Sequence, residues 1–241
     1  MKRHSIHIGI NKYEDFPDLP FCSADAELMG SFFRNVAKYD SVKEFVDSSR
    51  NAILDAIFAE INLLDSGDLL LITYSGHGMS QNKQWVLLAA DSRLCLIQSG
   101  MDGIPLNVIT EYARDRGVNL GFFIDSCPSE CMGTRGLIFG NSSLEKSSYG
   151  FDMSPNIDSG NLASLFIMLP SFAIEIPALG HGLFTVALDC ALRGLYETGT
   201  VTLEEIRKRV DEHISAICLD NGVDDIPVAT LTYAGSAVKL W

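Results

Sequence analysis

The most constraining feature of this sequence is the alternation of short apolar runs with segments whose apolar residues recur at helical spacing. This order is typical of an α/β fold in which helices cover both faces of a mostly parallel sheet. The run DLLLITYSG at 68–76 is apolar almost throughout, as buried parallel strands tend to be. Residues 50–64 instead place Ile53, Ile57 and Ile61 on one stripe of a helix. Strands are predicted over 4–11, 41–47, 68–76, 85–91, 118–127, 163–171 and 227–235, and helices over 23–37, 50–64, 105–115, 182–194 and 202–217.

The length of 241 residues favours a single domain over residues 1–241, although it also allows two small ones. Residues 128–160 interrupt the alternation, because they are rich in Ser, Gly and Asn. Such a stretch inside a compact domain is usually a functional or mobile loop, so we predict a flexible linker there. Further along, Thr202 and Glu205 have the spacing of a capping box at the start of a helix.

Charge and cysteine usage exclude several classes of protein. The formal net charge of −13 argues against a nucleic-acid partner and suits basic substrates. The apolar runs are too short to span a bilayer, and His7 interrupts any signal-peptide core, so we expect a cytoplasmic protein without a membrane partner. The six cysteines are scattered and would stay reduced there. They contain no Cys-x-x-Cys pair, so no zinc site is predicted.

Two predicted strands end in residues suited to nucleophilic catalysis. LLLITYSGHG delivers His77, and GFFIDSC delivers Cys127. Because ligands bind beyond the carboxyl ends of parallel strands, neighbouring strands would bring this imidazole and this thiol to one edge. A thiolate is the attacking form of cysteine, and an adjacent base raises its population. The glycines around His77 let the backbone approach a substrate and leave the Gly78 N–H available for an oxyanion.

For each of these two residues taken alone, a role outside catalysis is more common than a catalytic one. A lone cysteine at a strand end is usually an inert small apolar residue, and a lone histidine near a turn is usually structural or solvated. The joint occurrence of both, each directly after a buried strand and in a polar turn, favours catalysis.

These motifs resemble those of a known family. YSGHG and DSC look like the two catalytic motifs of caspase-like cysteine peptidases, in particular the metacaspases and their bacterial relatives. IGINKYEDFPDLPFCSADAELM is similar to the family's opening strand and loop, and GHGLFTVALDCALRG to its G-x-F-T-x-A-L helix. The resemblance implies a caspase-like three-layer sandwich and a cysteine endopeptidase. By this resemblance, His77 is the general base or acid, Cys127 is the nucleophile, and the amides of Gly78 and Cys127 hold the oxyanion.

The resemblance also implies a preference for Arg or Lys in protein or peptide substrates. Caspases proper carry Gln two residues before the nucleophile and an arginine near the first strand. At the corresponding places this chain has Asp125 and Asp25, respectively. In metacaspases the corresponding acids, with the serine equivalent to Ser75, line the pocket for a basic side chain. A carboxylate pair can bind a guanidinium through charge-assisted bonds. Taken alone, Asp25 would suit the first turn of a helix equally well.

Two departures from the family pattern matter. Metacaspases commonly read DSCHSG, whereas Pro128 follows the nucleophile here, stiffens the loop and removes a backbone donor. The segment after YSGHG is short and nearly free of acids, although calcium prefers several oxygen ligands. We therefore predict no tight calcium site, no other metal and no cofactor.

The linker contains two basic residues, Arg135 and Lys146, where relatives are often processed. An enzyme that cuts after basic residues could cut itself there, or an activating protease or regulator could do so. Ordinary solvated side chains are an equally good interpretation. His181 stands between glycines like His77, but it precedes the G-x-F-T helix and is interpreted as structural.

Two rival functions remain open from the sequence. The first is a catalytically silent caspase-like module that acts as a scaffold in signalling, which Pro128 favours slightly. The second is a caspase-like enzyme that prefers Asp, which would be favoured by an arginine near position 25. The apolar segment 227–235 suits either a monomer or a dimer paired through this strand.

Overall fold

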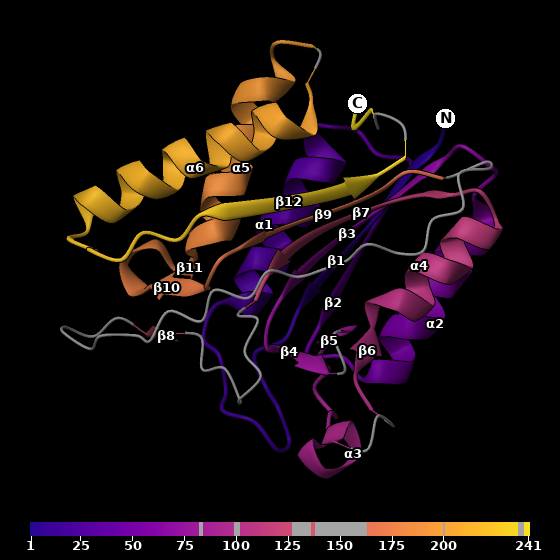
Figure 1. Ribbon diagram of the computed structural model, residues 1–241, viewed down its shortest axis with the longest axis horizontal. Coiled ribbons are helices and arrows are strands. Elements are labelled where there is room, and N and C mark those ends of the chain that lie inside the picture. The colour runs from indigo at the N-terminus through magenta and orange to yellow at the C-terminus, as the bar shows by residue number, and fades with distance from the viewer. Residues whose placement is uncertain (82–83, 99–101, 127–135, 138–162, 200, 236–238) are drawn as a thin grey trace.

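In the fold, seen in a computed structural model, a six-stranded sheet runs through the centre in the order β12-β9-β7-β3-β1-β2 (Figure 1). Strand β12 is antiparallel to its neighbour β9, and the other pairings are parallel. The structure describes residues 1–81, 84–98, 102–126, 136–137, 163–199, 201–235 and 239–241. The strands are β1 (Arg3–Gly9), β2 (Ser41–Val46), β3 (Leu69–Ser75), β7 (Asn119–Asp125), β9 (Leu165–Pro170) and β12 (Ala229–Ala234).

Helices cover both faces of this sheet and complete the predicted three-layer sandwich (Figure 1). One layer holds α1, α5 and α6, and the opposite layer holds α2 and α4. The fold class predicted from the alternation of strands and helices is therefore confirmed. The helices are α1 (Cys22–Asn35), α2 (Arg50–Leu63), α4 (Leu106–Asp115), α5 (Leu183–Tyr196) and α6 (Leu203–Asp220), with the short α3 (Leu94–Gln98) and the 3-10 turn η1 (Pro177–Leu179) in connections.

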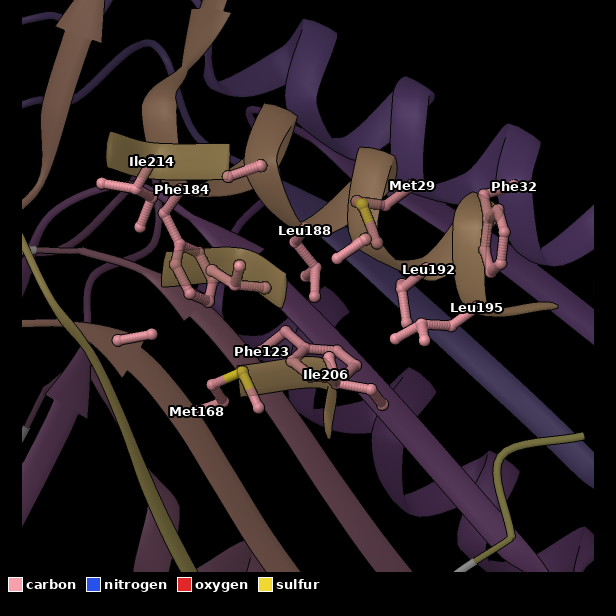
Figure 2. Close-up of a cluster of buried hydrophobic side chains, with 14 of the residues drawn as sticks. Met29, Phe32, Phe123, Met168, Phe184, Leu188, Leu192, Leu195, Ile206 and Ile214 are labelled. Atoms are coloured by element: carbon pink, nitrogen blue, oxygen red, sulfur yellow. The ribbon is translucent and has the colours of Figure 1, made fainter. Parts of the chain in front are cut away.

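The apolar strands feed two separate cores, because successive side chains of a strand point to opposite faces. In β3, Leu69 and Leu71 join the cluster under α1, α5 and α6, whereas Leu70 and Ile72 join the cluster under α2 and α4. All four side chains are fully buried. Figure 2 shows the first cluster, in which side chains from α1, α5, α6, β7 and β9 meet: Met29, Phe32, Phe123, Met168, Phe184, Leu188, Leu192, Leu195, Ile206 and Ile214.

Two small sheets lie beyond the central one. The predicted strand over 85–91 forms β5 (Gln84–Leu87), which pairs antiparallel with β4 (Gly78–Gln81) and β6 (Ile104–Pro105). The other small sheet joins β8 (Gly136–Leu137), β10 (Ile174–Ile176) and β11 (His181–Gly182). Strand β11 leads directly into α5, so it fixes how that helix begins.

The helix α6 begins as predicted. Thr202 is its N-cap, its hydroxyl accepts the Glu205 N–H at 3.2 Å, and the Glu205 carboxylate accepts the Thr202 N–H in return. This capping box satisfies backbone donors that the first turn would otherwise leave unpaired. Within the described ranges, no helix combines the length and the apolar character needed to cross a bilayer.

Three adjacent strands end in register at one edge of the central sheet. Gly9 of β1 pairs with Ser75 of β3, and Ser75 pairs with Asp125 of β7. At Gly9, a Cβ atom would collide with the carbonyl of Cys22, so glycine lets the start of α1 approach the end of β1. The edge therefore brings together the segments that follow β3 and β7 and the first turn of α1.

Candidate active site

The edge formed by β1, β3 and β7 carries most of the predicted site residues that the structure describes. Ser75 is the last residue of β3, Asp125 is the last residue of β7, and Asp25 lies in the first turn of α1. His77 follows β3 by two residues, and Gly78 begins β4. This placement follows from the parallel pairing of β3 with β7, which sets Ser75 opposite Asp125. Cys127, Arg135 and Lys146 lie outside the described residues, as does most of the predicted linker.

Side chains and backbone of the loop between β1 and α1 fix His77. The His77 Nε2 atom lies 2.8 Å from the carbonyl oxygen of Pro17, and the Tyr13 hydroxyl accepts the His77 N–H at 2.8 Å. The imidazole packs at a tilt against the Tyr13 ring, and it is only 5% exposed. Because a carbonyl oxygen only accepts, the proton sits on Nε2 and Nδ1 is the nitrogen that can exchange a proton.

Close packing explains the two glycines around His77. A Cβ on Gly76 would lie 2.6 Å from the Tyr13 hydroxyl and closer still to that of Tyr74. Both hydroxyls form hydrogen bonds with the backbone of His77: the Tyr13 hydroxyl accepts its N–H, and the Tyr74 hydroxyl donates to its carbonyl. A Cβ on Gly78 would lie 2.6 Å from Ser126 Oγ. The glycines thus permit tyrosine and serine side chains to approach the histidine turn.

The backbone at Gly78 is oriented away from the small sheet. Leu88 N donates to the His77 carbonyl at 3.0 Å, and Gly78 pairs with Leu87. In an antiparallel ladder this combination is a non-hydrogen-bonded pair, so the Gly78 N–H does not point at β5. Ser126, buried and next to Cys127 in the sequence, lies against Gly78. An amide donor and the residue before the candidate nucleophile therefore meet at the histidine turn.

A narrow recess of about 10 Å³ lies at the ends of β3 and β7, and β3 leads into this turn. Its lining includes the three residues predicted for substrate binding, Asp25, Ser75 and Asp125, and we call it the acidic recess. Both carboxylates are about 1% exposed. Their remaining surroundings combine apolar side chains with two threonine side chains: Ile8, Ala26, Met29, Thr73, Tyr74, Phe123, Phe184, Thr185 and Leu188.

Neutral donors hold the two carboxylates in place. The Ser75 hydroxyl donates to Asp25 Oδ2, and the Gly182 N–H donates to Asp25 Oδ1 at 3.0 Å. Asp125 Oδ2 accepts the backbone N–H of Thr185 at 3.1 Å and its hydroxyl at 2.9 Å. Asp125 thus binds a backbone donor in the first turn of α5, where the helix dipole favours a negative charge. The short strand β11 and the start of α5 therefore complete the recess.

His181 has a larger part in this site than its sequence context indicates. Its Nδ1 atom lies 3.1 Å from Asp25 Oδ1, and its side chain is 25% exposed. The hydrogen bond to Asp25 raises the pKa of His181 above its usual value, and the charges of Asp25, Asp189 and Glu27 act in the same direction against partial burial. Sequence reasoning missed this contact, although the G-H-G pattern before the α5 helix was its one visible sign.

Metal-ligating side chains do not cluster here. In the part of the chain that the structure covers, no group of three or more His, Cys, Asp or Glu residues could hold a metal ion. The sequence-based expectation of an enzyme without a tight calcium site stays a prediction.

The central sheet, the helices on both faces and the histidine turn define a caspase-like α/β fold. The family model described as the caspase domain matches residues 2–234. The chain therefore belongs to the caspase-domain family, a family of cysteine peptidases, as the motifs YSGHG and DSC predicted.

A comparison with solved structures agrees with this assignment. The protein GSU0716 from Geobacter sulfurreducens matches with a TM-score of 0.65 and 16% sequence identity. The match covers 98% of this chain and 94% of that protein. At this identity the likeness establishes a shared fold. No curated protein matches the chain.

Proposed function

We propose that this chain is a cysteine endopeptidase that cleaves peptide bonds after Arg or Lys, with Cys127 and His77 as its catalytic pair. Two buried carboxylates in one recess beside the His77 turn are the observation that carries the proposal. A guanidinium or ammonium group of a substrate can bind such carboxylates through charge-assisted hydrogen bonds. Membership of the caspase-domain family supports a cysteine peptidase in general.

The proposed reaction uses residues on both sides of the histidine turn. The Cys127 sulfur forms a bond to the carbonyl carbon of the basic residue, and the amides of Gly78 and Cys127 hold the oxyanion. His77 Nδ1 takes the thiol proton and gives it to the leaving amine as the C–N bond breaks. Water then hydrolyses the thioester. The bond from Nε2 to the Pro17 carbonyl fixes the ring through both steps.

The acidic recess supports the preference for basic side chains. Asp25 and Asp125 line the same recess; Ser75 pairs with Asp125 across the strands, and its hydroxyl orients Asp25. A pocket with two acids repels an acidic side chain and attracts a basic one, which argues against an aspartate-directed enzyme. We infer that Asp25, Ser75 and Asp125 bind the basic side chain and that protein or peptide substrates are selected through it.

Activation and organisation belong to the same proposal. We infer that cleavage after Arg135 or Lys146, by the enzyme itself or by an activating protease or regulator, converts a zymogen into the active form. We further infer a single peptidase domain over residues 1–241, in a cytoplasmic protein of the metacaspase branch. The match of the family model to residues 2–234 supports the single domain.

A catalytically silent scaffold is the alternative. It is favoured by Pro128 after the nucleophile and by the internal donors that already engage Asp25, namely Ser75, His181 and Gly182. Such a protein would keep the fold and the recess without turning over peptides.

Hydrolysis of reporter peptides distinguishes these functions. Three peptides that differ only in a final Arg, Lys or Asp are offered to the purified chain, to Cys127→Ala and to Cys22→Ala as a matched control at a buried cysteine of α1. We expect turnover of the Arg and Lys peptides that disappears in Cys127→Ala and persists in Cys22→Ala. Equal rates for the chain and Cys127→Ala would contradict peptidase activity, and a preference for the Asp peptide would contradict the basic pocket.

A further inference from the structure

The acidic recess has a histidine of its own beside one carboxylate. His181 reaches Asp25 Oδ1 from β11, which packs between α1, β10 and α5. Ser75 and Gly182 give the same carboxylate donors that never carry charge. His181 differs from them because its imidazole donates from Nδ1 whether it is neutral or protonated, and protonation adds a full positive charge.

We propose that His181 is a specificity-determining residue of the acidic recess, where its imidazole shares Asp25 with the cationic side chain of a substrate. Protonated His181 competes with that cation, and neutral His181 leaves the negative charge of Asp25 to it. The recess therefore binds basic side chains more tightly as the pH rises through the pKa of His181. This inference rests on the proposed preference for Arg or Lys.

The charged groups around His181 favour its protonated form. Among the described residues, the charged groups that act on it are Asp25 and Glu27 from α1 and Asp189 from α5. All three are acids, so they favour the imidazolium, and the pKa of His181 is raised above its usual value. With a quarter of its side chain exposed, His181 can exchange its proton with solvent while Asp25 stays buried.

Binding and protonation at one carboxylate are reciprocal. If a basic ligand binds more weakly to the protein with charged His181, the ligand must lower the pKa of His181 by the same coupling. A purely structural histidine would show no such link. The coupling also separates His181 from His77, which contacts the Pro17 carbonyl and Tyr13 rather than Asp25.

The test measures ligand binding without turnover. In Cys127→Ala, the Kd of Nα-acetyl-argininamide is measured by calorimetry between about pH 6 and pH 8.5, with the neutral citrulline analogue as ligand control. We expect binding of the arginine ligand to tighten at least about fivefold across this range and binding of the citrulline ligand to stay flat. Adding His181→Gln, which keeps a donor that cannot titrate, should abolish the dependence. His213→Gln on α6, a half-buried histidine outside the recess, should retain it.

A second measurement needs no substitution at His181. The pKa of the His181 ring, followed by NMR in Cys127→Ala, should fall when the arginine ligand saturates the protein. An unchanged ring pKa, or an unchanged pH dependence in His181→Gln, would overturn this inference and leave the preference for basic residues standing. Failure of the arginine ligand to bind at any pH would overturn both proposals. Binding with the expected pH dependence in a protein that cleaves no peptide would keep this inference and remove only the peptidase.

Discussion

Two regions of the molecule bury carboxylates to the same extent but surround them with different hydrogen-bond and ion-pair partners. In the acidic recess, the donors to Asp25 and Asp125 include hydroxyls, backbone amides and a histidine. On the opposite face of the sheet, Glu60 of α2 is about 1% exposed, lies next to the His4 imidazole and forms an ion pair with Lys43, whose Nζ lies 2.6 Å away. We call these three residues the Glu60 cluster.

The difference separates a carboxylate that serves stability from one that can serve binding. Lys43 of the same chain compensates Glu60, so the cluster needs no cation from outside. Hydroxyls, backbone amides and the titratable His181 donate to the recess carboxylates, whereas a lysine lies beside Glu60. Burial alone therefore does not distinguish the two sets of acids, whereas their donors do.

The largest expected effect comes from removing one recess charge. Asp25→Asn keeps the shape of the side chain and an oxygen for the Gly182 amide, but it loses the charge that attracts a basic substrate. We expect kcat/KM for an arginine reporter peptide to fall about a hundredfold, because a charge-assisted bond in a buried site is lost. Steady-state kinetics on matched arginine and citrulline peptides measure it.

The citrulline peptide is the control in this experiment, since it has nearly the same shape without the charge. Its slow turnover should change little in Asp25→Asn. An equal loss on both peptides would show that Asp25 acts through the architecture of the recess and would break the contrast with Glu60.

The strand ends show how far the sequence carries a prediction of this site. Ser75, His77 and Asp125 were placed correctly at one edge because continuous apolar runs predict parallel strands, and parallel strands end together. The match of the caspase-domain model confirmed the family. These residues are predictable because Ser75 ends β3, His77 follows it by two residues and Asp125 ends the neighbouring β7.

Contacts made by distant, short elements escaped prediction. His181 meets Asp25 only because β11, a strand of two residues, pairs with β10 and leads into α5. The Pro17 carbonyl holds His77, yet a backbone oxygen has no signature in residue type. Glu60 sits on a helix where a charged residue ordinarily faces solvent. In each case the partner is set by tertiary packing across tens of residues.

The pH dependence of stability reports on the buried carboxylates only after the contribution of a third buried group, His7, is known. His7 lies on β1 with His4, but its ring stacks on Phe33 in the other core and contacts Ser5 and Thr73 hydroxyls. Burial lowers the pKa of His7 to about 3. As the pH falls below about 6.5, His7 binds a proton in the unfolded chain but stays neutral in the folded protein. The stability that the neutral His7 contributes is therefore present above this pH and is lost as the pH falls toward about 3.

The expected size follows from this difference in pKa. Between pH 7 and pH 5 the free energy of unfolding should decrease by about 2 kcal/mol through His7. Urea unfolding of the chain and of His7→Gln, which can keep polar contacts to Ser5 and Thr73, measures it. The variant should have a visibly shallower pH dependence over this range. The same slope in both proteins would assign acid destabilisation to other groups.

The smallest expected effect tests the Glu60 cluster itself. Burial acts to raise the pKa of Glu60, but the hydrogen bond and charge of Lys43, together with His4, outweigh it and lower the pKa. The cluster therefore contributes stability above the unfolded pKa of Glu60 and loses it as the pH falls through the folded value. Glu60→Gln should lower the free energy of unfolding at neutral pH by about 1 to 2 kcal/mol, toward the low end because Lys43 is 44% exposed and can turn to solvent.

Specificity is the property in which the two regions must differ. In Glu60→Gln the ratio of kcat/KM for arginine and citrulline peptides should stay within about twofold of the parent value, since Glu60 lies in the core on the other face of the sheet. Chemical unfolding and the same kinetic assay, applied to Glu60→Gln and Asp25→Asn side by side, then give opposite patterns: a loss of stability in one and a loss of charge selectivity in the other. A drop in charge selectivity in Glu60→Gln would mean that the Lys43-compensated acid and the recess acids are coupled, and that donor type does not divide them.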